Sequence, residues 1–299
     1  MKVIFGIDKV RRLRSPVVAI GVFDGVHRGH RKILTAVVRK AKSLGVKSAV
    51  LTFWPHPQKE KKLYSLEHRL RLIEDLGIDI CIVSGFSRRI SSIKPKDFVE
   101  KILAKKIRAG YVYVGSDFKF GNRAEGDASL LKRTGEEYGI KTEVFKIIKD
   151  SGKSISSTLI RGLISQGEIN HAKSLLGRPV SILGTVIRGS SLGRILGFPT
   201  ANIDPHHEVI PPCGIYAVRI IFAGRKFKGV CYIGKRPTIT RTDKINIEVH
   251  VLNFSQNIYG KSLEIQFLSK IRSDKKFPTI SLLVRQIRKD ISIASKVRL

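Results

Sequence analysis

The chain contains the stretch Val17-Val18-Ala19-Ile20-Gly21-Val22-Phe23-Asp24-Gly25-Val26-His27-Arg28-Gly29-His30. Its first seven residues, Val17–Phe23, are apolar apart from one glycine and predict a buried strand. The glycines of the stretch permit tight turns and a close approach of the backbone to a ligand. A helix is expected to follow, and its first turn would present free N–H groups and a positive dipole end. The stretch therefore predicts a phosphate site between a strand and a helix.

Two histidines at the end of this stretch suggest the chemistry of the site. His27 and His30 are three residues apart, so the start of a helix would place both rings on one side. Two imidazoles in that position can donate hydrogen bonds to phosphate oxygens that gain charge during a phosphoryl-type transfer. The alternative is a chance pattern with one histidine satisfied in the core. The position directly after a predicted strand favours the functional interpretation.

The rest of the first half alternates apolar runs with segments of helical periodicity. This alternation predicts an α/β fold with a parallel sheet and helices on both faces. Ligands bind beyond the carboxyl ends of the strands in such sheets, which is where the histidines lie. The expected strands are Val17–Phe23, Ser48–Phe53, Ile78–Val83, Tyr111–Val114 and Glu143–Ile148. Helical spacing is shown by Ile33, Leu34, Val37, Val38, Ala41 and Leu44, by Leu66, Leu70, Ile73 and Leu76, and by Phe98, Val99, Ile102 and Leu103.

The pattern changes after about residue 178. Short, often alternating apolar runs are separated by Gly, Pro and Asn, which predicts an antiparallel β-barrel that ends in one helix. We place the domain boundary near Gly177-Arg178-Pro179, giving domains 1–178 and 179–299. The expected strands are Ser181–Arg188, Gly214–Phe222, Phe227–Gly234, Ile245–Leu252 and Ser262–Phe267. The terminal helix is marked by Ile280, Leu283, Val284, Ile287 and Ile291.

Composition narrows the class of protein. The 299 residues suggest two domains, and no apolar run approaches the roughly 20 residues that a membrane span requires. Met1–Asp8 reaches a charge too early for a secretion signal, so we expect a cytoplasmic protein without a membrane partner. Cys81, Cys213 and Cys231 are odd in number and form no CxxC pair, which argues against a disulfide framework and a thiolate zinc site.

The net charge of +32 would suit a nucleic-acid-binding protein, because lysine and arginine neutralise phosphates. The basic excess is spread evenly over both predicted domains, however, and forms no basic tail. An even excess also suits small anionic substrates. We therefore expect no dedicated nucleic-acid partner.

A second glycine-rich signature lies in the second half, where residues 193–202 read Gly-Arg-Ile-Leu-Gly-Phe-Pro-Thr-Ala-Asn. Its glycines, with Gly189 before them, allow backbone amides to approach phosphate, and Arg194 adds positive charge. Thr200 and Asn202 offer hard oxygen ligands of the kind that Mg²⁺ accepts beside phosphate oxygens and water. The chain thus carries two separate phosphate-handling signatures.

These motifs resemble those of the bacterial riboflavin kinase/FAD synthetase family, whose N-terminal module belongs to the HxGH nucleotidyltransferase superfamily. The FDG-x-H-x-GH run of residues 23–30 carries the resemblance. Three further segments match, namely Thr52–Pro57, Val114–Gly121 followed by Gly126-Asp127, and Ile155–Arg161. Trp54 stands where the family more often has a polar residue.

For the first domain the resemblance implies an FMN adenylyltransferase. The implied catalytic residues are His27, His30 and Arg161, the last as a charge clamp. The implied ATP contacts are Gly21, Phe23, Asp24, Gly25, Ser156, Ser157 and Thr158, and the implied FMN contacts are His56, Pro57, Asp117, Phe118 and Phe120. Taken from the residues alone, a Ser/Thr cluster before a helix is usually a cap, and Thr158 could serve as one. Asp117, Phe118 and Phe120 are equally well explained as a turn residue and two core aromatics.

For the second domain the resemblance implies a riboflavin kinase, in which a glycine loop and the PTAN turn bind ATP and Mg²⁺. Thr200 would be the metal ligand, and the ATP contacts would be Gly189, Gly193, Arg194, Gly197, Phe198, Pro199 and Asn202. A kinase needs a group that orients and deprotonates the attacking hydroxyl, and Glu248 matches the family's base. Without the resemblance, a lone strand glutamate would be expected to face solvent. Tyr232 stands where the family usually has Asn, and His206, His207 and His250 are expected to have surface or core roles.

The function expected from the sequence is the synthesis of FMN and FAD from riboflavin and ATP, in two steps on two domains. Two alternatives stay open: another HxGH-type adenylyltransferase, which would leave residues 193–202 and Glu248 unexplained, and a basic nucleic-acid-binding protein. The sequence makes no prediction of the oligomeric state.

Overall fold

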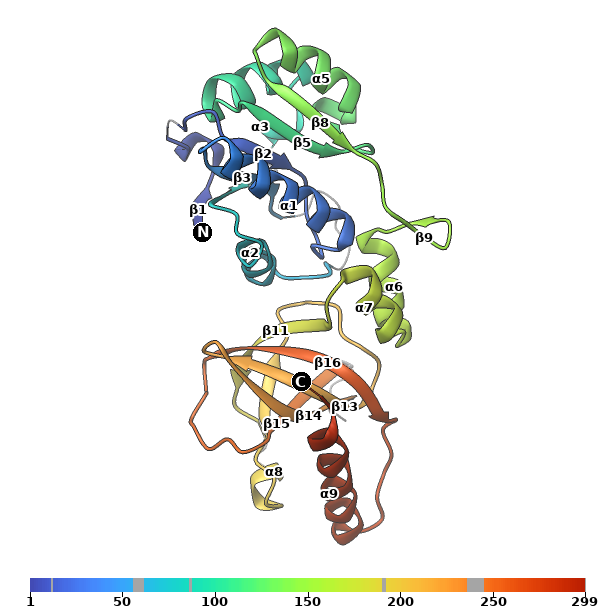
Figure 1. Cartoon of the computed structure of the whole chain (residues 1–299). Helices are drawn as coiled ribbons and strands as arrows, with labels where there is room; N and C mark the ends of the chain where they lie inside the picture. The colour runs from blue at the N-terminus through green and yellow to red at the C-terminus, as the bar shows by residue number, and fades with distance from the viewer. Residues whose placement is uncertain (12, 56–61, 86–87, 190–191, 236–244, 299) are drawn as a thin grey trace. The chain divides into compact units, whose positions relative to one another are not determined.

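The computed structural model describes residues 1–11, 13–55, 62–85, 88–189, 192–235 and 245–298 (Figure 1). The chain divides into two compact units. Unit 1 comprises Met1–Lys62 and Leu66–Ser157, and unit 2 comprises Leu63–Ser65 and Thr158–Leu299. Within the described residues, no helix combines the length and the apolar character needed to cross a bilayer.

Unit 1 is built on a six-stranded parallel sheet with the order β1-β4-β3-β2-β5-β8. From β2 the chain adds β3 and β4 on one side, and it then adds β5 and β8 on the other. Such a reversal of strand order opens a crevice at the carboxyl ends of the two strands that flank it. The strands are β1 (Lys2–Phe5), β2 (Val17–Ile20), β3 (Ser48–Phe53), β4 (Ile80–Ser84), β5 (Tyr111–Gly115) and β8 (Lys141–Phe145).

Helices cover both faces of this sheet, as the sequence pattern predicts, and Figure 1 shows α1 and α5 on opposite sides of the strands. All four residues of β2 are buried, which fits a central strand covered on both faces. The larger helices are α1 (Arg28–Ser43), α2 (Leu66–Glu74), the π-helical η2 (Phe98–Ile107) and α5 (Ala128–Glu137). Shorter elements are η1 (Ile7–Lys9), α3 (Arg88–Ser91), α4 (Pro95–Asp97), β6 (Lys119–Phe120), η3 (Asn122–Ala124), β7 (Gly126–Asp127), β9 (Lys149–Asp150) and β10 (Lys153–Ser154).

Three local expectations for unit 1 are wrong. The segment Glu143–Ile148 was expected to be a buried strand, but β8 spans Lys141–Phe145 at the edge of the sheet and none of its residues is buried. Strand β2 ends at Ile20, and it cannot extend to Phe23 as expected because the backbone there has a positive φ of 52°. Helix α2 is present, but His68, Arg69, Leu72 and Ile73 are its buried residues, so the buried face is rotated from the expected row of Leu66, Leu70, Ile73 and Leu76. Arg69 is therefore buried in unit 1.

Unit 2 contains a closed barrel of six antiparallel strands in the order β11-β12-β15-β14-β13-β16, which confirms the predicted barrel and terminal helix. The strands are β11 (Val180–Ile187), β12 (Ala201–Asp204), β13 (Gly214–Phe222), β14 (Arg225–Lys235), β15 (Ile245–Val251) and β16 (Ser262–Arg272). The helices of this unit are α6 (Ser157–Gln166, whose first residue belongs to unit 1), α7 (Ile169–Leu176), α8 (Leu192–Ile195) and α9 (Ile280–Lys296).

A buried ion pair attaches the terminal helix α9 to the barrel. The Asp290 carboxylate accepts from Arg272 Nη2 at 2.9 Å and from Arg272 Nε at 3.1 and 3.2 Å, and Gln286 Nε2 also donates to it at 2.9 Å. The Asp290 side chain is 3% exposed. Removing one member of such a pair leaves a charge buried without compensation.

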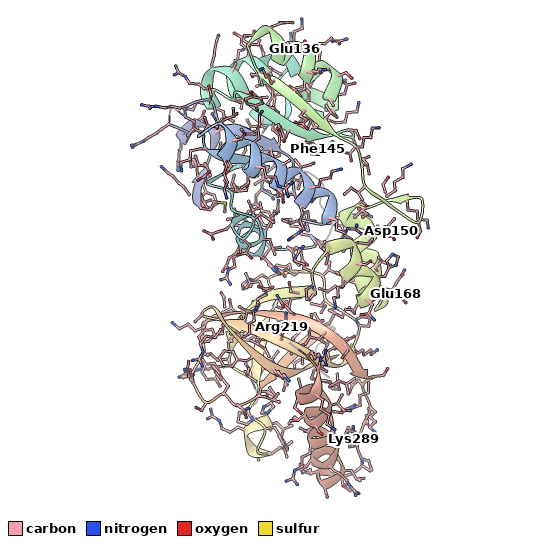
Figure 2. All side chains as sticks on the ribbon, viewed as in Figure 1. Glu136, Phe145, Asp150, Glu168, Arg219 and Lys289 are labelled. Carbon is pink, nitrogen blue, oxygen red and sulfur yellow. The ribbon has the colours of Figure 1, made fainter. Side chains whose placement is uncertain are left out.

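We therefore predict that Asp290→Ala lowers the unfolding free energy of unit 2 by about 3–5 kcal/mol. Scanning calorimetry of the full chain should show a lower transition temperature for unit 2 and an unchanged one for unit 1. Lys289→Ala, at the exposed neighbour labelled in Figure 2, is the control. Equal transition temperatures for the two variants would contradict the assigned role of the pair.

Candidate functional sites

The connection between β2 and α1 is a strained turn. Phe23, Gly25 and Val26 have φ values of 52°, 85° and 41°. The left-handed region is ordinary for glycine but costly for a β-branched residue such as valine. Phe23, Asp24 and Val26 are nevertheless buried, at 2%, 4% and 0% exposure. Backbone strain of this kind persists where the surroundings fix the conformation, and it is common at functional sites.

The turn places the two histidines against each other at the start of α1. His27 is the N-cap residue, and its Nδ1 accepts a hydrogen bond from the His30 backbone N–H at 3.4 Å. The two imidazole rings stack with centroids 3.7 Å apart, and the Phe23 ring meets His30 edge-on at 5.2 Å. A Cβ atom at Gly29 would lie 3.2 Å from the His27 ring, so a larger residue would press on the pair. The predicted juxtaposition of the histidines is present.

A cavity of about 190 Å³ lies beside this pair at the reversal of strand order. Its walls come from the start of α1, from the ends of β5 and β8, and from the segment before α6. Phe145 at the end of β8 is labelled in Figure 2. Among the expected site residues, His27, His30, Asp117, Ser156 and Ser157 line the cavity; Lys32 and Lys146 also line it and were not expected.

The serine-rich segment contacts the strained turn directly. Ser157 Oγ donates a hydrogen bond to the backbone oxygen of Asp24. Helix α6 begins at Ser157, so Thr158 lies in its first turn rather than at the cap position. Thr158 and Arg161 belong to unit 2, where Arg161 Nη2 donates to Thr158 Oγ1 at 2.9 Å.

Of the described residues that were expected to contact FMN, Asp117 lines the cavity beside the histidines, and Phe118 and Phe120 do not. His56 and Pro57 lie outside the described residues. Phe120 is 7% exposed and Phe118 packs against the same apolar core, where the two rings stack with centroids 5.5 Å apart. Asp117 lies in the cavity wall, and its Oδ1 would be 2.7 Å from a Cβ at Gly115.

In unit 2 the second signature brings backbone and side chains into close contact. A Cβ at Gly189 would lie 2.0 Å from Asn202 Nδ2, and a Cβ at Gly193 would lie 2.6 Å from the Phe198 oxygen. Gly197 has a φ of 85° and ends the short turn after α8, where Phe198 N–H donates to the Gly193 oxygen at 2.7 Å. The Gly-rich segment therefore folds against the PTAN turn.

One face of β15 holds this turn in place. Glu248 Oε2 accepts a hydrogen bond from Thr200 Oγ1 at 3.0 Å, and Glu248 Oε1 accepts from Asn246 Nδ2 at 2.7 Å. His250 Nδ1 lies 2.8 Å from the Pro199 backbone oxygen and donates to it. The sequence pattern did not indicate Asn246, and it predicted only a surface or core role for His250. Their alternate spacing with Glu248 on one strand could have indicated them, since residues two apart share a face.

Two cavities meet at Thr200. The larger, of about 500 Å³, is lined largely by apolar side chains, including Leu283, Ile287 and Ile291 of α9, and it also contains Glu248 and His250. The smaller, of about 390 Å³, contains Arg194 and Pro199. Thr200 belongs to the wall of both.

Tyr232 also lines the larger cavity, and its hydroxyl donates to Asp274 Oδ2 at 3.2 Å. Burial and the neighbouring Asp274 raise the pKa of Tyr232 to about 12. The phenol therefore stays neutral across the physiological range and acts as a hydrogen-bond donor there.

Comparison with known families matches both units. The FAD synthetase family matches residues 9–159, and the riboflavin kinase family matches residues 176–298. A Haemophilus influenzae protein named bifunctional riboflavin kinase/FMN adenylyltransferase is 37% identical, covering 98% of each chain. A Bacillus subtilis protein of the same name is 36% identical over 92% of this chain and 90% of its own.

A solved structure shares the fold over its full length. It is described as a macrolide-efflux protein from Streptococcus pneumoniae, is 26% identical, covers 100% of both chains and gives a TM-score of 0.85. The two family matches and the near-complete coverage of the named relatives agree with the pair of sites found in the two units. The chain belongs to the bifunctional riboflavin kinase/FMN adenylyltransferase family.

Proposed function

We propose that unit 2 transfers the γ-phosphoryl group of ATP to the 5′-hydroxyl of riboflavin, with Glu248 as the base. The observation that carries this proposal is the position of Thr200, which lines both cavities and donates to Glu248 at 3.0 Å. The larger, apolar cavity suits the isoalloxazine ring, and the smaller one suits ATP. The reacting hydroxyl and the γ-phosphorus would then meet beside Thr200.

The carboxylate of Glu248 is held ready for proton transfer. Asn246 and Thr200 each bind one of its oxygens, which fixes the plane of the carboxylate. During transfer Glu248 would take the proton of the 5′-hydroxyl, the bond from that oxygen to the γ-phosphorus would form, and ADP would leave. Asn246 and His250 would act by orienting the base and the PTAN turn.

Mg²⁺ fits the donor set at this turn. Thr200 Oγ1 and the Glu248 carboxylate provide hard oxygen donors within 3.0 Å of each other, and Asn202 is the register partner of Glu248 across β12 and β15. Thr200 would hold the ion together with phosphate oxygens. When bound, the ion neutralises charge on the β- and γ-phosphates.

We further propose that unit 1 joins FMN to the adenylyl group of ATP. The FMN phosphate would attack the α-phosphorus, and pyrophosphate would leave with the electrons of the broken bond. His27 and His30 would donate hydrogen bonds to the charged oxygens. The strained turn, the stacked rings and the cavity at the strand reversal support this role.

We assign the adenylyltransferase to residues 1–178 and the kinase to 179–299, in a cytoplasmic enzyme without a nucleic-acid or membrane partner. The even spread of basic residues supports an adaptation to anionic small molecules.

Substitutions at the two sites should separate the two activities. Glu248→Gln should lower the rate of FMN formation from riboflavin by about 100-fold or more, because the base is lost, and should still convert supplied FMN to FAD. His30→Ala should lower FAD formation by about 100-fold and leave FMN formation intact.

Chromatography of the flavins after incubation with ATP and MgCl2 measures both products. Glu264→Gln in the barrel and His171→Ala on α7 are controls outside the cavities, and both should behave as wild type. If Glu248→Gln and His30→Ala each impair both reactions equally, the assignment of one reaction to each unit fails.

Removal of the metal should stop the kinase. A chelator should abolish FMN formation, and added MgCl2 should restore it. Thr200→Val should raise the MgCl2 concentration needed for half-maximal rate by about tenfold, because one oxygen ligand is lost. An unchanged MgCl2 dependence in Thr200→Val would exclude Thr200 as a metal ligand.

A further inference from the structure

Arg69 is a charged side chain inside unit 1 that no step of the proposed function uses. It lies on α2, is 0% exposed and has the largest side chain among the fully buried residues. Its Nε and Nη2 atoms have no hydrogen-bond partner among the described residues. An unsatisfied buried donor costs about 1–3 kcal/mol, so Arg69 is not explained by stability.

The shortest hydrogen bond of Arg69 is with the backbone of the phosphate signature. Arg69 Nη1 donates to the Val22 oxygen at 2.6 Å. Thr52 Oγ1, at 0% exposure on β3, donates to the same oxygen at 2.9 Å. A carbonyl oxygen can accept two hydrogen bonds, so side chains from two other elements fill its capacity.

Val22 directly precedes the residues of the strained turn. A turn with left-handed Phe23 and Val26 keeps its shape only if its ends are fixed. Ser157 donates to the Asp24 oxygen, and Arg69 and Thr52 donate to the Val22 oxygen. The turn is therefore held at two backbone carbonyls, one on each side of Phe23.

The surroundings of Arg69 orient its guanidinium. Burial lowers the pKa of the Arg69 guanidinium, whereas the negative charge of Asp24 within the turn raises it. The guanidinium carbon lies 5.0 Å from the centroid of the Trp54 ring, in a cation–π contact. Trp54, which departs from the family pattern, therefore helps to orient the arginine.

We propose that Arg69, assisted by Thr52, is a positioning residue for adenylyl transfer. By fixing the Val22 carbonyl it sets the strained turn, and the turn places His27 and His30 beside the cavity. This inference rests on the proposed adenylyltransferase function of unit 1. Arg69 acts through the backbone and contacts no substrate.

The test uses Arg69→Met, Arg69→Lys and Thr52→Val in the full chain. Arg69→Met should lower kcat for FAD formation from FMN by about 10- to 100-fold, as expected for a small misplacement of catalytic groups, with KM for ATP changed by less than about threefold. Arg69→Lys keeps a positively charged donor group, and its rate of FAD formation should fall less than that of Arg69→Met. Because both donors act on one oxygen, the double variant Arg69→Met/Thr52→Val should lose less than the product of the single losses.

The same polypeptide supplies the folding control, since FMN formation by unit 2 should remain at the wild-type rate in every variant. Arg71→Met is the matched control on α2, where Arg71 is exposed and pairs with Glu67. Thr142→Val on β8 is the matched control for Thr52→Val. FAD formation by Arg69→Met within about twofold of wild type, or an equal loss of FMN formation, would overturn the proposal.

Hydrogen exchange of the ligand-free protein gives a second measurement that does not depend on activity. The Val26 amide donates to the Phe23 oxygen within the turn at 3.2 Å, and its exchange should become about tenfold faster in Arg69→Met but not in Arg71→Met. Unchanged exchange would refute the anchoring role even if activity falls. A wild-type chain that forms no FAD would instead refute the proposed function of unit 1.

Discussion

Both sites depend on glycines that lie so close to a functional side chain that a larger residue would clash with it. In unit 1 the His27 ring lies 3.2 Å from the place of a Cβ at Gly29, and in unit 2 Asn202 lies 2.0 Å from the place of a Cβ at Gly189. Any side chain at Gly189 would displace Asn202 and, through β12, the turn that carries Thr200. The two folds are unrelated, yet each brings backbone against a functional side chain in this way.

The two units fix their sites by different means. In unit 1 a strained turn is held by side chains on its backbone oxygens, from Thr52, Arg69 and Ser157. In unit 2 the PTAN turn is held by a row of side chains on one regular strand, β15. The first arrangement relies on tertiary contacts between distant segments. The second relies on the fact that alternate residues of a strand share one face.

This difference explains which parts of the structure could be predicted from the sequence. Apolar periodicity predicted the parallel sheet, and β3 (Ser48–Phe53) and β13 (Gly214–Phe222) match their expected bounds. The strained turn could not be predicted, because valine gives no local signal for a positive φ. The closed order of the barrel depends on pairing between distant strands, and β12 was missed because its four residues lie partly within the glycine-rich signature.

The position of Arg69 in the sequence already indicated that it could be buried. It lies three residues after Leu66 and four before Ile73, so it shares their side of the helix. A charged residue in such a row predicts either a rotated helix face or a buried polar contact, and both are present here. Asn246 likewise lies two residues before Glu248 on a strand that was correctly expected.

The cap formed by His27 also determines where its proton resides. Because Nδ1 accepts the His30 amide hydrogen, the neutral ring must carry its hydrogen on Nε2. The neutral imidazole can thus donate a hydrogen bond from Nε2 to an anion.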